Sequence, residues 1–243
     1  MVGRSHSRNR CASFSALLIL LWATGGPLGG SAQADPYSPL TACPPPAVSP
    51  APAEPLVACA GMEGVSVALF DHWMQVAADG EAEHGSAVVP VPPLYGRCIA
   101  RRSARQGKGG RHPAPSTAKF KLACEREYRR LREESLDFLI SSAWLTGEAA
   151  ALKVELSEAA VHRSFVHIRN QQFPKRSEFR AFLHSSGQTV ADLMFRVRLN
   201  LLTSRLVKRL APDTSSFTTR WLAQTSCAAG YAVKDCGQVV PAL

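Results

Sequence analysis

Three helical segments in succession, each with its own stop signal, constrain the fold of this chain more than any other feature. Along this stretch the apolar residues recur three and four positions apart, which is the spacing of one helix face. Phe173-Pro174 ends the first segment, because a proline lacks a backbone N–H and pushes the residue before it out of the helical region. Gly187 closes the second segment and Pro212 the third. The pattern predicts helices over 157–172 and 177–184, followed by a third that ends at Pro212.

The starts of these helices carry signals as well. Ser157 offers a hydroxyl group that can cap the first helix. Thr189, with Asp192 three residues later, has the spacing of a capping box for the third. Start and stop signals agree, so we expect these boundaries in the folded chain.

Two further helices are predicted before these three. Residues 117–152 form one long helix whose first half is charged (EREYRRLREE) and whose second half is mostly apolar (FLISSAWLTGEAAAL). Charged pairs four residues apart, such as Arg130 with Glu134, indicate a solvated helix face rather than a binding site. Each pair stabilises a helix by only about 0.2–0.5 kcal/mol. The apolar half must therefore pack against the later helices. A shorter helix is predicted over 66–78, and the fold class is mainly α.

The first 34 residues have the composition of a secretory leader. Three arginines precede the apolar run 14–23, and Ala32-Gln33-Ala34 supplies small residues of the kind that signal peptidase recognises. The apolar run is shorter than the roughly 20 residues that span a bilayer. We therefore expect a signal peptide over 1–34 and a mature chain outside the cytoplasm.

A second interpretation of the N-terminus stays open. Leu40-Thr41-Ala42-Cys43 has the form of a lipobox, the motif at which bacterial lipoproteins are cleaved and acylated on the cysteine. A lipidated Cys43 would anchor the chain to the outer face of a membrane, with the proline-rich segment after it as a semi-rigid tether. Without the lipid, we expect residues 35–63 to form a disordered, proline-rich linker.

Six cysteines follow the leader, an even number that suits disulfide pairing in an oxidising compartment. The loop closed by the last two is small, and closing it would contribute about 2–3 kcal/mol in the entropic description. No CxxC or histidine-cluster spacing indicates a metal, so no cofactor is expected. The expected pairs are Cys227–Cys236, Cys98–Cys124 and, unless Cys43 carries a lipid, Cys43–Cys59.

Positive charge is concentrated in one glycine-containing segment, RRSARQGKGGRHP. Without the three leader arginines the chain has 25 basic and 19 acidic residues, a net charge of +6. The segment is either a mobile solvated loop or a contact for an anionic envelope surface such as lipid headgroups. Nucleic acid is not an expected partner, because the segment lacks interleaved aromatic residues. The basic residues concerned are Arg101, Arg102, Arg105, Lys108 and Arg111.

No catalytic residues are predicted. The histidines are scattered, and His162 and His167 stand five positions apart rather than four. His72 lies on a helix that is expected to pack into the core, where a structural role is the common one. Gly187 and the two serines before it form a helix ending, and the glycines at 107–110 lack the preceding strand that a phosphate loop needs.

Five segments occur in an order that resembles a known family. They are GVSVALFDHWMQVAA, FLISSAWLTGEA, VELSEAAVHRSF, FPKRSEFRAFLHSSGQTVADLMFRVRLNLL and the tail FTTRWLAQTSCAAGYAVKDC. From Gly64 onward the chain resembles the N-terminal chaperone module of the SurA and PrsA type foldases, which are secreted bacterial proteins that shield unfolded clients. The resemblance implies a mostly helical cradle with long paired helices. Together with the helix and cysteine patterns above, it leads us to expect an extended helical domain with one long helix, several short ones and a disulfide-closed C-terminal tail.

Members of this family sometimes carry a parvulin prolyl isomerase domain between the last long helix and the tail. Here only residues 211–216 separate the two, whereas an inserted domain needs on the order of a hundred residues. Isomerase activity is therefore implied by the resemblance alone. We expect a helical chaperone-like domain over 64–212 and a C-terminal helix with a disulfide loop over 213–243.

The function that the resemblance implies is binding without chemistry, in which a helical cradle holds unfolded or nascent segments of exported proteins. Two alternatives stay open: a prolyl isomerase with residual or lost activity, and an envelope lipoprotein that binds one dedicated partner. No more than two or three of the candidate client-binding residues are expected to be exposed and the others to belong to the core. The candidates are Trp144, Phe165, Phe173, Phe179, Phe182, Met194 and Phe195.

Overall fold

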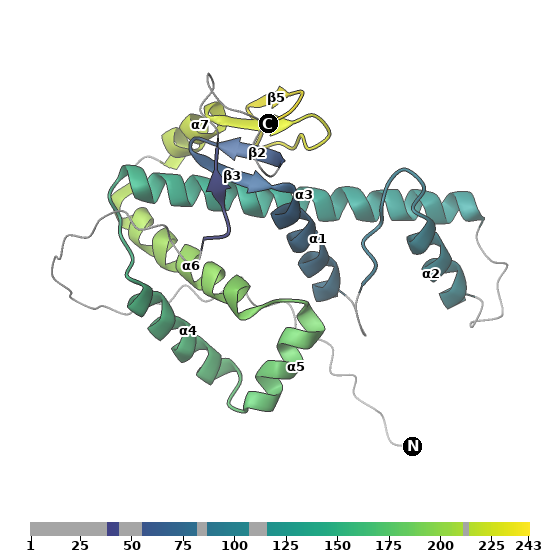
Figure 1. Cartoon of the computed structure of the whole chain (residues 1–243), viewed down its shortest axis with the longest axis horizontal. Coiled ribbons are helices and arrows are strands. Elements are labelled where there is room, and N and C mark those ends of the chain that lie inside the picture. Colours follow the sequence, from purple (N-terminus) through teal and green to yellow (C-terminus); the bar gives the residue numbers. More distant parts are fainter. Residues whose placement is uncertain (1–37, 44–54, 82–86, 107–115, 211–213) are drawn as a thin grey trace, which may run out of the picture. The chain divides into compact units, whose positions relative to one another are not determined.

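The computed structural model describes residues 38–43, 55–81, 87–106, 116–210 and 214–243, and this part of the chain is mainly helical with a small sheet (Figure 1). No described helix combines the length and apolar character needed to cross a bilayer. The helices are α1 (Val67–Glu81), α2 (Gly96–Gln106), α3 (Thr117–Ala151), α4 (Glu158–Gln172), α5 (Arg176–Ser186), α6 (Val190–Leu210) and α7 (Thr214–Ala223). The strands are β1 (Thr41–Ala42), β2 (Leu56–Ala60), β3 (Glu63–Ser66), β4 (Thr225–Ala228) and β5 (Gln238–Val240).

The predicted helix boundaries agree with the structure to within a few residues, and the capping groups act as expected. The hydroxyl of Ser157 accepts a hydrogen bond from the Ala160 N–H at 3.3 Å. Gly187 has φ 64°, the left-handed conformation that closes a helix without strain for glycine. At the start of α6 the Thr189 N–H donates to Asp192 Oδ2 at 2.7 Å, and the Asp192 N–H donates to Thr189 Oγ1 at 3.1 Å. Pro212 lies outside the described residues.

The sheet joins the N-terminal and C-terminal parts of the described chain. Its strand order is β1-β3-β2-β4-β5, with β2 antiparallel to both β3 and β4 and with β4 parallel to β5. Gly61, with φ 60°, makes the turn between β2 and β3. All five residues of β2 are buried, and Ala58 lies opposite Cys227 of β4. Residues 56–63 are therefore not part of a linker, which corrects the prediction for 35–63.

The six cysteines from Cys43 onward form the expected pairs: Cys43–Cys59, Cys98–Cys124 and Cys227–Cys236. The sulfur of Cys43 cannot hold a disulfide and a lipid thioether together, so this structure is not compatible with the lipidated alternative. Disulfides persist in oxidising compartments, and the three bonds indicate an extracytoplasmic setting.

The basic segment begins as a helix rather than as a loop. Residues 96–106 form α2, which the Cys98–Cys124 disulfide joins to α3. Arg102 Nη2 donates to Glu127 Oε2 at 2.6 Å, and Arg101 lies 3.7 Å from the other oxygen of the same carboxylate. Arg105 is exposed in the last turn of this helix, whereas Lys108 and Arg111 lie outside the described residues.

The C-terminal half of α3 is the centre of the core. Leu136, Leu139 and Ile140 are fully buried there. In Figure 1 the sheet and α7 lie along one side of this half, and α1 and α6 pack against it from other directions. The ring of Trp73 on α1 lies 4.5 Å from that of Phe138 on α3, and Phe195 on α6 completes the group at 6.1 Å from Phe138.

Polar contacts fix α7 and β4 to the same helix. Glu148 is only 2% exposed, and its Oε2 accepts hydrogen bonds from the Arg220 guanidinium and from Trp221 Nε1, the latter at 2.7 Å. Trp144 Nε1 donates to Thr225 Oγ1 at 2.7 Å. Gly147 makes room for the Trp221 ring, because a Cβ at this position would lie 2.2 Å from Trp221 Cη2.

We predict that Gly147→Ala destabilises the protein although alanine favours a helix. The propensity gain of about 1 kcal/mol is smaller than the cost of displacing the Trp221 ring and its bond to Glu148, so the free energy of unfolding should fall by about 2 kcal/mol. Gly80→Ala is the matched control in α1, where no atom lies within 4 Å of the added Cβ. Urea unfolding of the oxidised protein should show a loss for the first variant and a gain of up to about 1 kcal/mol for the second. An unchanged Gly147→Ala variant would contradict the packing described.

Candidate functional site

The candidate site lies where α4, α5 and α6 meet. α4 packs along α6, and four buried residues form a small hydrophobic core between them. The apolar positions of α4 fall four apart, which turns one face of the helix toward α6 and leaves the other in solvent. These buried residues are Val161 and Phe165 of α4 with Met194 and Val197 of α6.

α5 is held much less firmly than its neighbours. Of its eleven residues only Ser186, at its C-terminal end, is buried. The N-cap residue Lys175 makes no side-chain capping hydrogen bond. A helix of this length is marginal in water by itself, so its contacts with α4 and α1 decide its position. The lack of burial makes α5 the element of this region that can move or open most readily.

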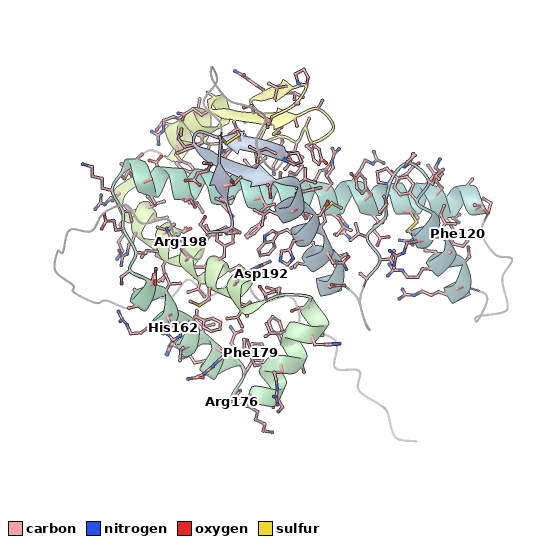
Figure 2. The ribbon with its side chains drawn as sticks, in the orientation of Figure 1. Phe120, His162, Arg176, Phe179, Asp192 and Arg198 are labelled. Carbon is pink, nitrogen blue, oxygen red and sulfur yellow. A yellow bond between two sulfur atoms is a disulfide. The ribbon has the colours of Figure 1, made fainter. Side chains whose placement is uncertain are left out.

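Four phenylalanines connect α5 to α4, and we refer to Phe165, Phe173, Phe179 and Phe182 as the aromatic cluster. The Phe173 ring lies 4.9 Å from that of Phe182 and 5.6 Å from that of Phe179. Phe179 also meets the buried Phe165 at 6.2 Å, and Figure 2 shows Phe179 between α4 and α5. Phe173, Phe179 and Phe182 are half-buried, so each keeps part of its ring in solvent.

The other predicted client-binding residues are parts of the core. Trp144 packs edge-on against Phe217 and donates its N–H to Thr225, while Phe195 packs against Trp73 and Phe138. Met194, like Phe165, is buried between α4 and α6. Neighbouring helices cover the side chains of these four candidates, so none of them offers an exposed ring or thioether to a client in this structure. The other three candidates, Phe173, Phe179 and Phe182, are partly exposed.

Two carboxylates lie where the α5–α6 turn meets α1. Asp192 Oδ1 accepts a hydrogen bond from His72 Nε2 at 2.9 Å, since a carboxylate can only accept. Asp79, which is buried on α1, accepts from the Ala87 N–H at 2.6 Å and lies against Gly187. A Cβ at Gly187 would lie 2.5 Å from Asp79 Oδ2, so the turn can approach α1 this closely only with glycine there. The C-terminal end of α5 is thus held close to α1.

Arg196 ties α6 to α1 and α3 in a different way. Its guanidinium carbon lies 4.8 Å from the Trp73 ring centre and 5.2 Å from that of Phe138, which is cation–π geometry. Burial lowers the pKa of Arg196, and the Asp192 carboxylate partly opposes this shift. The contact adds to the packing that keeps α6 in place beneath the aromatic cluster.

Among the described residues, no group of three or more histidine, cysteine or acidic side chains could hold a metal ion. His162, His167 and His184 are exposed on α4 and α5, so they lie outside the small core between α4 and α6. Basic residues outnumber acidic ones on these two helices, with four arginines against Glu158 and Glu178. The arrangement offers partly exposed aromatic rings with a basic surround, which suits binding rather than bond chemistry.

Sequence reasoning missed the anchoring of this region to α1. The capping pattern of Thr189 and Asp192 was visible, but His72 lies 120 positions before Asp192. Periodicity indicates which face of a helix is buried and says nothing of which distant helix it meets. The close approach at Gly187 was equally hidden, because a glycine at a helix end is already explained by the turn.

We predict that Asp192→Ala lowers the free energy of unfolding by about 2–3 kcal/mol, since it removes the capping box and leaves His72 without its partner. His72→Ala should cost only about 1 kcal/mol, because the capping box survives. Urea unfolding of both variants measures the difference. Equal, small losses below about 0.5 kcal/mol would mean that this junction does not hold the turn.

The chain was compared with protein-family models, with curated proteins and with solved structures, and none of the three comparisons found a match.

Proposed function

We propose that this chain is an exported chaperone of the holdase type, which binds unfolded or extended segments of secreted proteins. The observation that carries the proposal is the aromatic cluster, where Phe173, Phe179 and Phe182 are half-buried and lie on or next to a helix that is otherwise almost unburied. Clients would be held at these rings.

The physical properties of the cluster suit clients of varied sequence. Phenylalanine rings offer a large apolar area without a directional hydrogen bond, so they accept many partner side chains. Surfaces that bind many partners are often able to adjust, and α5 is the least buried helix of this region. A rigid base is present at the same time, because Phe165 and Met194 fasten α4 to α6 below.

The order of elements supports the same proposal. The helices carry the segments that resemble the SurA and PrsA type chaperone module, in one extended helical arrangement with a long α3. Only residues 211–213 separate α6 from α7, so no domain of ordinary size is inserted at this point. The three disulfides suit a protein that works in the cell envelope or outside the cell.

The test is the aggregation of a chemically unfolded model protein, followed by light scattering as the oxidised chain is added in increasing amounts. The wild-type chain should suppress aggregation. Phe173→Ser and Phe182→Ser, combined, should raise the amount needed by about fivefold or more, because two exposed ring surfaces are lost. Val207→Ser is the matched control, since this exposed residue of α6 lies outside the cluster.

A circular dichroism melt of each variant separates loss of binding from loss of fold. Clients that aggregate unimpeded with the folded wild-type chain would overturn the proposal, as would full suppression by the double phenylalanine variant. Proline isomerisation is measured on the same samples, and turnover by the wild-type chain would favour the isomerase alternative instead.

A further inference from the structure

α2 and the N-terminal part of α3 form a second surface that shares no residue with the aromatic cluster. We define the arm as residues 91–106 and 116–127. Figure 1 shows α2 beside the N-terminal part of α3, well away from α4 and α5. The Cys98–Cys124 disulfide joins the two helices, and Tyr95 packs against Tyr128 with ring centres 6.3 Å apart. The surface of the arm is therefore preorganised.

Positive charge is concentrated on this arm. Seven arginines and lysines and two glutamates give it a net charge of +5, out of +9 for the whole chain. α2 itself has four arginines and no acidic residue. Arg97, Arg101 and Arg105 stand four positions apart and so share one face of the helix. Arg97 and Arg105 are exposed, while Arg101 and Arg102 lie near Glu127.

Large apolar side chains are exposed on the same arm. Leu94 is 77% exposed and Val91 is 65% exposed, both in the turn that leads into α2. Leu122, on α3, is 55% exposed. Among the described residues, these are three of the seven large apolar side chains that stand out into solvent. Neither the disulfide nor the tyrosine pair covers them.

We propose that the arm docks on an anionic lipid bilayer. Aliphatic side chains beside arginines are the combination that interfacial membrane binding uses, because the apolar groups enter the headgroup boundary while the cations meet lipid phosphates. A purely electrostatic partner would make no use of the exposed Leu94 and Leu122. The proposal is independent of the holdase function, because the arm shares no residue with the aromatic cluster.

The test is co-sedimentation of the oxidised chain from Asp35, which contains every described residue, with phosphatidylcholine vesicles that contain or lack phosphatidylglycerol. The wild-type chain should bind only the anionic vesicles, and less well at high salt. Arg97→Gln with Arg105→Gln should lower the affinity about thirtyfold, because each positive charge near the surface raises the affinity for an anionic bilayer roughly fivefold. Leu94→Ser with Leu122→Ser should lower it about tenfold.

Lys153→Gln with Lys208→Gln is the matched control, which removes the same charge from exposed positions outside the arm and should leave binding unchanged. Equal losses in the control and in the arginine variant would reduce the effect to net charge and overturn the proposal. Undiminished binding after both leucine changes would overturn it too, because charge alone would then hold the arm on the vesicles. Failure of the wild-type chain to bind anionic vesicles would end the proposal directly.

Discussion

Burial of the C-terminal half of α3 is the constraint on which the rest of the structure depends. This half is apolar on most of its surface, and no single neighbour can cover it. The chain covers it with α1 and α6 on some sides and with the sheet and α7 on another. α7 is fitted tightly against α3, because its Trp221 ring lies against Gly147 and its Trp221 N–H donates to the buried Glu148. The remaining helices are positioned by their neighbours: α4 packs on α6, α5 contacts α4, and a disulfide joins α2 to α3.

The elements differ in how firmly that centre holds them, and the difference bears on function. α6 is fixed by Phe195, by the Arg196 stack and by the capping box that joins His72. α4 is fixed to α6 by a small core of its own. α5 is fixed chiefly at its end and through partly exposed phenylalanines. A well-anchored base with one loosely held, aromatic-rich helix is what a binder of varied unfolded segments needs.

Local signals in the sequence were enough to predict α4, α5 and α6, because Pro174, Gly187 and the capping residues act within one turn of where they stand, whereas α2 was not predicted. The sheet was not predictable in the same way. β2 is a five-residue apolar run next to a proline-rich segment, and its pairing with Cys227 of β4 depends on contacts across most of the chain. The exposed part of the candidate site was not predictable from local signals either. The sequence named the exposed phenylalanines together with four core residues, and only packing separates the two groups.

Hydrogen–deuterium exchange, measured with and without a chemically unfolded client, tests whether α5 and its phenylalanines bind clients. We expect the amides of α5 to exchange faster than those of α3 in the free protein, because α5 is scarcely buried. On addition of the client, exchange should slow over residues 173–183, which contain the three partly exposed rings of the aromatic cluster. Slowing that appears only elsewhere in the chain, with residues 173–183 unchanged, would contradict the assignment of this region as the client-binding site.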